Sequence, residues 1–597
     1  MFNTLQILIT AGPVKKRIIL NTAILASVSS LFINVPAAAK QVTNLNQEIS
    51  PARKINHPPQ RALRAKQQER EVRNDQFRTI DGSNNNLQFP TMGMPHTQLF
   101  RLMGSDYDDE VSAMAGSYRP SARLISNLIF SQTDSIPNSL NASDYLWQWG
   151  QFLDHDIDLT DGADPLESAN IPVPAGDAYF DPEGTGSKEI ALNRSIYDAS
   201  SGAGKPRQQL NEVTSWIDAS NIYGSSLTRA NALRTFAGDG KLKTSDGNLL
   251  PFNTEGLANA GGGGSSLFLS GDVRANEQVG LTAMHTLFMR EHNRLAGLIA
   301  EEDPQLSGEQ IYQKARKLVG AEMQLITYRE YLPALLGPGS ISPYRGYNSS
   351  VDASIANIFS TAAYRYGHSA LNSTLQRIDE FGQQSVYGHL ALREAFFNPS
   401  RIIEGGIDPV LRGLAEQAAQ AVDTKVIDDV RNFLFGAPGA GGFDLVSLNI
   451  QRGRDHGLPS YNDVRELLGF SRAHYFSDIS SDPDIQARLT SAYDSVNDID
   501  LWVGGLSEDP VARSHVGPLF HSIIKEQFEA LRDGDRYWYA ISLSRKERKM
   551  VQRLRLSDII RLNTDIGNEI NNDVFHVESP GRGNPFNRGK GKSRIRK

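Results

Sequence analysis

The sequence of 597 residues contains no cysteine. Disulfide bonds, thiolate metal sites, iron–sulfur clusters and catalytic thiols are therefore excluded. A dimer held together by disulfides is excluded for the same reason. Because exported proteins often use disulfides for stability, an exported protein of this composition must depend on its core and on any bound ion or cofactor.

An excess of positive charge is also missing. The formal net charge is −7. Residues 1–39 hold three basic residues and no acidic one, so removing them from the chain of charge −7 leaves −10. An acidic chain of this kind is not expected to bind nucleic acid in general.

Long apolar runs are scarce, and the one candidate lies at the start of the sequence. Basic residues at 15–17 precede a charge-free run over 18–33, and "PAAAK" follows. This pattern is typical of a secretory signal peptide. We expect a signal peptide over 1–39, cleavage after Ala39 and an extracellular location, with the periplasm and the cell surface as alternatives. The rival interpretation, a membrane anchor, needs about 20 apolar residues, and no later segment is apolar enough to span a bilayer.

Composition divides the remaining chain into three parts. Residues 40–76 are polar and basic and indicate a flexible leader. Residues 77–570 have globular composition and predict one large catalytic domain. Residues 571–597 indicate a disordered basic tail, since their final 17 residues contain seven basic residues and no acid. Such a tail either solubilises the protein or contacts an anionic surface.

Strand-like alternation is scarce, whereas helical periodicity is frequent. Apolar residues recur near 3.6-residue spacing over 279–302, and a similar pattern covers 309–336. Four consecutive glycines at 261–264 predict a loop. The sequence therefore predicts a mainly α-helical single domain with little β structure.

The segment "WGQFLDHDID" over 149–158 concentrates a glutamine, a histidine and three aspartates. On a helix, Gln151 and His155 share a face because they are four residues apart. Asp156 is rotated by about 100° from His155 and should face elsewhere, while Asp158 is expected to be solvated. By itself, the segment is more typical of a structural or surface helix.

The segment "TSWIDASNIYGSS" carries a residue suited to oxygen ligation at every second position. These residues are Thr214, Trp216 (through its main chain), Asp218 and Ser220. Calcium prefers six to eight oxygens that include carboxylate charge, and Asp156 can supply a second carboxylate. On its own, such a loop is more often a turn.

Three further segments carry polar residues whose meaning depends on context. They are "GDVRANEQ" with Arg274 and Glu277, "YRYGHSAL" with His368, and "SLNIQRGRDHGLPSYN" with Asn449 and Arg452. A single arginine is most often a surface charge, and a lone histidine is most often a satisfied core residue. The polar density of the third segment indicates a buried network.

Taken together and in order, these segments resemble the animal-type haem peroxidases of the peroxidase–cyclooxygenase superfamily. The matching stretches lie between roughly residues 77 and 565 and read "RTIDGSNNN", "WGQFLDHDID", "TSWIDASNIYGS", "GDVRANEQVGLTAMHTLFMREHNRL", "YRYGHS", "LNIQRGRDHGLPSYN", "DLWVGGL", "VGPLF" and "DGDRYWY". Nine motifs in family order make the resemblance specific for the fold and for the chemistry. The missing cysteines and the style of the signal peptide favour a bacterial source.

The resemblance implies a haem held on one side by His368. This histidine would ligate the iron, and the side-chain oxygen of Asn449 would accept a hydrogen bond from its other ring nitrogen. Arg365 and Arg452 would pair with the haem propionates or with neighbouring groups.

On the opposite side, the resemblance implies a peroxide-reacting site. His155 would move the proton of hydrogen peroxide, Arg274 would stabilise the developing charge, and Gln151 would hold a water or a small anion. Asp154 and Glu277 would form ester bonds with the haem methyl groups. Asp156 would complete the calcium site described above.

One departure from the family pattern concerns the substrate. Position 278 is glutamine, where the chloride-oxidising leukocyte enzyme of the family has a methionine bonded to the haem. Without that bond the haem should be less oxidising. The resemblance therefore implies a secreted peroxidase that uses hydrogen peroxide to oxidise bromide, iodide or thiocyanate to hypohalous-type oxidants, and phenolic compounds by single electrons.

Three alternatives remain beside the peroxidase. A fatty-acid dioxygenase of the same superfamily would carry a tyrosine three residues before the proximal histidine, and Arg365 occupies that position. An extracellular calcium-stabilised adhesion or matrix protein would not need the intact peroxidase residues. A zinc hydrolase using His285 and His292 would need an HExxH motif, which the sequence lacks.

Overall fold

The structure, a computed structural model, describes residues 77–578. The expected signal peptide at 1–39, the leader at 40–76 and most of the basic tail lie outside the described residues. Within them, the strands form three short antiparallel pairs. These pairs are β1 (Thr97–Gln98) with β4 (Leu210–Asn211), β2 (Ile171–Pro172) with β3 (Glu189–Ile190), and β5 (Thr374–Leu375) with β6 (Leu390–Ala391).

Helices make up the rest of the regular structure, as expected from the periodicity. In the first half they are α2 (Ala122–Ile129), α3 (Tyr145–Ile157), α4 (Ser220–Tyr223), α5 (Leu227–Leu233), α6 (Val279–Glu302), α7 (Gly308–Ile326), the π-helix η2 (Thr327–Tyr331), α8 (Leu332–Leu336), α9 (Asn357–Thr361) and the 3₁₀-helix η3 (Ala363–His368). In the second half they are α10 (Ser400–Ile403), α11 (Asp408–Glu416), α12 (Asp428–Arg431), α13 (Leu445–Asp455), α14 (Tyr461–Leu467), α15 (Pro483–Ala492), α16 (Leu501–Ser507), α17 (Pro518–Asp533), α18 (Tyr539–Ser542), α19 (Arg545–Val551) and α20 (Leu556–Asn563). Short 3₁₀ turns are η1 (Asp246–Asn248), η4 (Leu392–Glu394), η5 (Phe476–Asp478) and η6 (Val496–Asp498).

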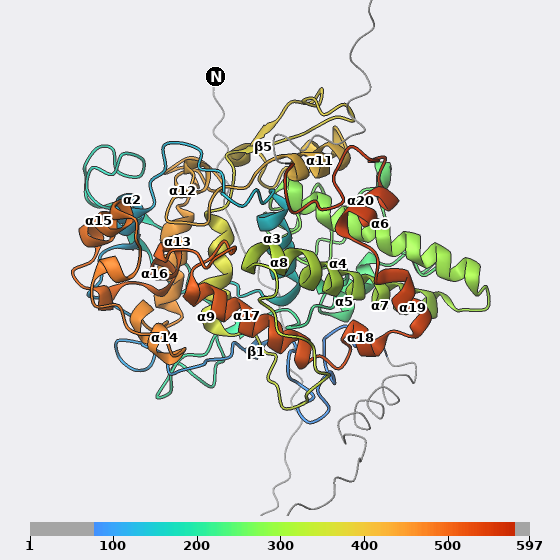
Figure 1. The fold of residues 1–597 in the computed structure, drawn as a ribbon, viewed down its shortest axis with the longest axis horizontal. Coiled ribbons are helices and arrows are strands. Elements are labelled where there is room, and N and C mark those ends of the chain that lie inside the picture. Colours follow the sequence, from blue (N-terminus) through green and yellow to red (C-terminus); the bar gives the residue numbers. More distant parts are fainter. Residues whose placement is uncertain (1–76, 579–597) are drawn as a thin grey trace, which may run out of the picture. The chain divides into compact units, whose positions relative to one another are not determined.

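Helix α3, which carries the motif at 149–158, is surrounded by other helices (Figure 1). It packs against α4, α6 and η3. Trp149 and Phe152 are fully buried, and their rings lie 5.8 and 5.2 Å from the ring of Phe288 on α6. Aromatic pairs at these distances add to the stabilisation from apolar burial, so α3 is held firmly in the core.

Helices α6 and α7 form an extensively packed pair. Helix α6 covers the predicted range 279–302, and its first turn is capped by the side chain of Gln278, which accepts from the backbone N–H of Gly280. The range 309–336, which the periodicity joins into one pattern, is divided by η2 between α7 and α8. A π-helical turn changes the direction in which the following side chains point.

The folded region extends past the boundary expected at residue 570. Val574 and Phe575 are fully buried. The ring of Phe575 lies 6.2 to 6.3 Å from the rings of Tyr145, Trp149 and Tyr331. The assignment of 571–578 to a disordered tail was therefore wrong, because the basic composition begins only after these apolar residues. No helix among residues 77–578 combines the length and the apolar character needed to cross a membrane.

Candidate active site

A cavity of about 350 Å³ lies between α3, the segment before α6, η3 and α13. Residues from several stretches that are far apart in the chain contribute its walls, and these four carry the predicted site residues. The nine residues that the family resemblance places around a haem all line it: Gln151, Asp154, His155, Arg274, Glu277, Arg365, His368, Asn449 and Arg452. The fold therefore brings the complete predicted set together.

His155 is almost fully buried on the α3 wall, at 3% exposure. Burial, followed by the nearby Arg274 guanidinium, holds the pKa of His155 well below its ordinary value. The imidazole is therefore neutral at pH 7, which is the form that can accept a proton. Its Nδ1 lies 3.5 Å from a carboxylate oxygen of Asp272.

Arg274 is fixed by Asp272, a residue that the sequence analysis did not select. The Arg274 guanidinium donates to both carboxylate oxygens of Asp272 at 2.9 Å and to the main-chain oxygen of Asp158 at 2.8 Å. Burial opposes ionisation of Asp272, but Arg274 holds the pKa of this carboxyl below its usual range. The only sequence signal for Asp272 is its position two residues before Arg274 in the same motif.

Gln151 is held by Gln278, the cap of α6. The Gln278 amide nitrogen donates to the side-chain oxygen of Gln151 at 3.0 Å and to that of Gln148 at 2.6 Å. Gln278 is the residue at which the resemblance implies a difference from the chloride-oxidising enzyme. It is therefore hydrogen-bonded to a residue of the cavity wall.

Three carboxyl groups line the cavity. Burial raises the pKa of Asp154 to about 8 and the pKa of Glu277 to about 7. Asp158 was expected to be solvated, and this expectation was wrong: it is 6% exposed, lines the cavity and has a pKa raised by burial. It lies just past the end of α3, where the chain turns inward instead of continuing along the outer face.

His368 stands at the end of η3 on another wall of the cavity. Burial, with a smaller effect from Arg365, lowers its pKa to about 3, so the ring is neutral. Its Nδ1 lies 2.7 Å from the amide nitrogen of Asn449, and the Asn449 oxygen accepts from Arg365 at 3.2 Å. With the Asn449 nitrogen facing Nδ1, the proton of the neutral ring would lie on Nε2. Binding of an iron through Nε2 needs the reverse amide orientation, in which the Asn449 oxygen accepts from Nδ1–H, as the resemblance implies.

The two arginines on this side differ in their partners. Arg365 also donates to the main-chain oxygen of Ser360 at 3.0 Å. Arg452 donates to Ser195 at 2.8 Å and to Asp455 at 3.0 Å. Both still line the cavity and so present positive charge to an anionic group bound there.

The donor set fits a haem. A neutral histidine with a free ring nitrogen suits the iron, and Nε2 of His368 has no hydrogen-bond partner among residues 77–578. Arg365 and Arg452 suit the propionates. Asp154 and Glu277 each face the same space with a carboxyl group.

The five residues predicted to bind calcium also lie together, away from the cavity. All are buried, and they are Asp156, Thr214, Trp216, Asp218 and Ser220. The Asp156 carboxylate accepts from the backbone N–H groups of Asp218 and Ala219 at 3.1 and 3.2 Å, and Thr214 donates to Asp218 at 3.1 Å. The second oxygen of Asp218 is buried without a hydrogen-bond partner.

The predicted calcium site contains two carboxylates, Asp218 from the loop and Asp156 from α3. The described residues hold no group of three or more histidine, aspartate or glutamate side chains arranged for a metal. Any cation here must therefore take its remaining ligands from hydroxyl and main-chain oxygens, as calcium accepts.

His285 and His292, considered above as zinc ligands, are both fully buried on α6. Nδ1 of His285 lies 3.0 Å from the hydroxyl of Ser270, and Nδ1 of His292 lies 2.9 Å from that of Tyr223. Nε2 of His292 also lies 3.0 Å from the main-chain oxygen of Gly240, whereas Nε2 of His285 is buried without a hydrogen-bond partner among residues 77–578.

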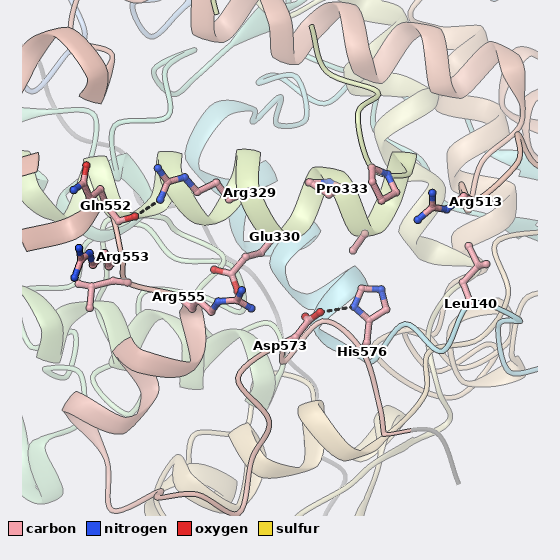
Figure 2. A pocket seen from close by; sticks show the side chains of 13 residues that line it. Leu140, Arg329, Glu330, Pro333, Arg513, Gln552, Arg553, Arg555, Asp573 and His576 are labelled. Atoms are coloured by element: carbon pink, nitrogen blue, oxygen red, sulfur yellow. Dashed lines mark hydrogen bonds and ion pairs between the residues drawn. The ribbon is translucent and has the colours of Figure 1, made fainter. Parts of the chain in front are cut away.

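A larger cavity, of about 640 Å³, is lined by none of the predicted site residues. Figure 2 shows Glu330 extending from its helix towards Arg555 and Arg329 directed to Gln552, with the Asp573–His576 pair nearby. Arg513 and Arg553 complete its basic lining. Its lining includes one histidine, His576, and therefore lacks a pair of histidines such as His155 and His368 in the first cavity.

Comparisons with known proteins agree with this assignment. Residues 77–575 match the family described as "Animal haem peroxidase". Peroxinectin A from Dictyostelium discoideum is 37% identical over 519 residues, which cover 84% of this chain and 96% of that protein. The human peroxidasin homolog is 37% identical over 552 residues, which cover 84% of this chain and 37% of that protein. The chain thus spans about a third of the length of the peroxidasins that it matches.

Solved structures give the same result. Peroxidase A from Dictyostelium discoideum has a TM-score of 0.77 and 36% identity, covering 84% of this chain and all of that chain. The fatty acid alpha-dioxygenase of Oryza sativa has a TM-score of 0.70 at 21% identity, with 87% of this chain and 92% of that chain covered, and shares the fold alone. The chain therefore belongs to the animal haem peroxidases, a family of oxidoreductases.

Proposed function

We propose that the protein reduces hydrogen peroxide and oxidises bromide, iodide or thiocyanate to hypohalous-type oxidants. One observation carries this proposal: neutral His155 and the fixed Arg274 line the same cavity as His368. Phenolic compounds are proposed as additional one-electron donors. Export to the extracellular space is proposed from the N-terminal sequence.

In this proposal the haem, when bound, supplies a redox-active iron held by His368. His155 accepts the first proton of hydrogen peroxide and returns it to the leaving oxygen. Arg274 stabilises the negative charge that develops as the oxygen–oxygen bond breaks. Gln151 holds a water or a small anion beside the reacting atoms.

We propose that Asp154 and Glu277 attach the haem covalently. Each ester would join a carboxylate oxygen of one of these residues to a haem methyl carbon, and peroxide would supply the two-electron oxidation that this bond requires. The position of both carboxyls on the cavity wall supports this proposal. In the loaded protein, the haem absorbance should stay with the polypeptide during acid–organic extraction, and Asp154→Ala should release more haem while the folded structure remains.

Bromide, iodide and thiocyanate are proposed over chloride because of Gln278. Its amide is engaged with Gln148 and Gln151, and an amide cannot supply the sulfur bond to haem that the chloride-oxidising relative uses. The fatty-acid dioxygenase alternative is not favoured, since Arg365 occupies the position of the required tyrosine.

The test measures steady-state rates of the haem-loaded protein with peroxide and chloride, bromide, iodide or thiocyanate. His155→Ala should slow the reaction with peroxide by about 10²- to 10⁴-fold while haem remains bound. His474→Ala, which changes an exposed histidine outside the cavity, is the matched control and should keep the wild-type rate. Failure to consume peroxide with any of these donors would refute the proposal.

We also propose a calcium ion bound by Asp156, Thr214, Trp216, Asp218 and Ser220. The unpartnered, buried oxygen of Asp218 supports it, because a buried carboxylate needs a compensating charge or donor. Calcium should stabilise the folded protein by about 2.7 kcal/mol when its free concentration is 100 times the Kd. A chelator should therefore lower the Tm, and Asp218→Asn should remove most of this response; a Tm that ignores calcium in the wild type contradicts the site.

A further inference from the structure

Three buried tyrosines join the cavity to the core behind it. Tyr364 and Tyr366 line the cavity on either side of Arg365. The hydroxyl of Tyr331, on η2, lies 2.7 Å from that of Tyr366 and donates to that of Tyr364 at 3.0 Å. Gly150 on α3 leaves room for this cluster, because a Cβ there would lie 3.0 and 3.1 Å from the hydroxyl oxygens of Tyr366 and Tyr331.

The hydroxyl groups need an explanation beyond packing. Phenylalanine would fill nearly the same volume without burying polar atoms, and burying a hydroxyl is costly unless it is hydrogen-bonded. Tyr331 meets this need only through the other two tyrosines. The cluster therefore keeps three oxidisable phenols in mutual contact at the cavity wall.

Further aromatic residues continue from this cluster towards the surface. Tyr328 lies on η2 three residues before Tyr331, and both rings pack against Phe528. Its ring centroid is 4.8 Å from that of Trp538, which is 4.7 Å from that of Tyr539. Phe528 on α17 fixes the turn between them, with its ring 6.2 Å from Tyr328 and 6.5 Å from Tyr331.

The series ends at a partly exposed residue. Trp538 is 3% exposed, whereas Tyr539 at the start of α18 is only partly buried. Arg329 and Glu330, which lie between the two tyrosines on η2, line the arginine-rich cavity (Figure 2). The π-helical turn thus separates two charged side chains from two tyrosines that face the core.

We propose that this aromatic series carries electrons from a phenolic donor at Tyr539 to the haem cavity. The path runs through Trp538, Tyr328 and Tyr331 to Tyr366 or Tyr364. Only the tyrosine and tryptophan side chains are oxidised along this path, because a phenylalanine ring is too hard to oxidise. The inference rests on the proposed peroxidase function and adds a second, external site of oxidation.

The donors suited to such a site are phenolic groups on molecules too large for the cavity of about 350 Å³, such as tyrosine side chains of another protein. Per turnover, one hydrogen peroxide and two phenols give two waters and two phenoxyl radicals. Each phenol loses one electron to the series and one proton to solvent. Each ring of the series is restored when the next electron arrives, so over one turnover the series itself gains and loses neither electrons nor protons.

The test compares free tyramine with tyramine tethered to dextran, using the haem-loaded protein and peroxide. Trp538→Phe should lower the rate with the tethered donor by about tenfold or more, while iodide oxidation stays at the wild-type rate. Tyr328→Phe, which removes the oxidisable phenol and keeps the ring, should also lower the rate with the tethered donor. Tyr475→Phe, at a 71% exposed tyrosine outside the series, should change neither rate.

A second readout locates the radical without relying on turnover. A nitrone spin trap added with peroxide should label Tyr539 in the wild type, as found by peptide mass spectrometry, and this label should be lost in Trp538→Phe. The inference would be overturned if the wild type oxidises iodide normally but Tyr539 is not labelled, and if Trp538→Phe leaves the rate with the tethered donor unchanged. The proposed peroxidase function would still stand. If the wild-type protein does not oxidise iodide at all, the proposed function itself is overturned.

Discussion

At the scale of single residues, Asp272 determines how Arg274 faces the cavity. The two side chains form a paired set of hydrogen bonds at 2.9 Å, and a bidentate arginine–carboxylate contact fixes direction as well as distance. Asp272 also approaches Nδ1 of His155 at 3.5 Å. It acts through both residues and therefore has a positioning role in the proposed mechanism.

Replacing Asp272 by asparagine should disorder Arg274, because the amide keeps one acceptor and loses the charge. The second-order rate constant for the reaction with peroxide should fall by about tenfold or more. Stopped-flow absorbance measures this step separately from halide oxidation. Haem content and the KM for iodide should hardly change, and an equal loss in every step would point to a structural defect instead.

Patterns in the sequence predict some residues of the candidate site but not others. Gln151, His155 and Arg274 could be predicted because helical spacing and family motifs identify them. Asp272 could not, since nothing in one sequence says that it turns back towards Arg274. The hydrogen bond between Asn449 and Arg365, 84 residues apart, could not be predicted either, because such a long-range contact leaves no local pattern.

At the scale of elements, α3 must approach η2 and η3 closely, and Gly150 permits this. A Cβ at this position would press on two hydrogen-bonded hydroxyls that are themselves buried. The range of α6 could be predicted from periodicity alone. The break at η2 could not, because the apolar pattern over 309–336 runs through residues 327–331, which include neither glycine nor proline.

Gly150→Ala should destabilise the protein although alanine favours helix. The gain in helix propensity is about 1 kcal/mol, whereas overpacking costs about 1–3 kcal/mol. Urea unfolding measures the difference. In a Tyr366→Phe background, which removes the nearest hydroxyl, the cost of the same change should shrink; an equal cost in both backgrounds would show that the tyrosine contact is not responsible.

At the scale of the whole molecule, a chain without disulfides tolerates buried charge only where it is compensated. Arg123, for example, is fully buried and bonds with Asp177 and Asp444 at 2.7 and 2.9 Å. Such pairs are costly to break singly. Glu322 departs from this pattern, because neither of its carboxylate oxygens has a hydrogen-bond partner among residues 77–578.

Glu322 lies on α7, and its neighbour on α6 is the fully buried Glu291, which bonds with Arg294. Burial, and then the charge of Glu291, raise the pKa of Glu322 well above its ordinary value. The folded protein therefore holds a proton that the unfolded chain releases above about pH 4.3. Stability should fall as pH rises from there towards the folded pKa, by up to about 1.4 kcal/mol per pH unit.

Glu322→Gln should remove this dependence, because the amide has the shape of the protonated acid and cannot ionise. The stability of the variant relative to the wild type should increase as the pH rises above about 4.3, the ordinary pKa of a glutamate, until Glu322 ionises in the folded protein. Urea unfolding at several pH values measures both proteins. Glu301→Gln, at an exposed position of α6, is the control and should leave the slope unchanged. A Glu322→Gln slope equal to that of the wild type would mean that Glu322 is ionised in the folded protein, with its charge compensated between α6 and α7.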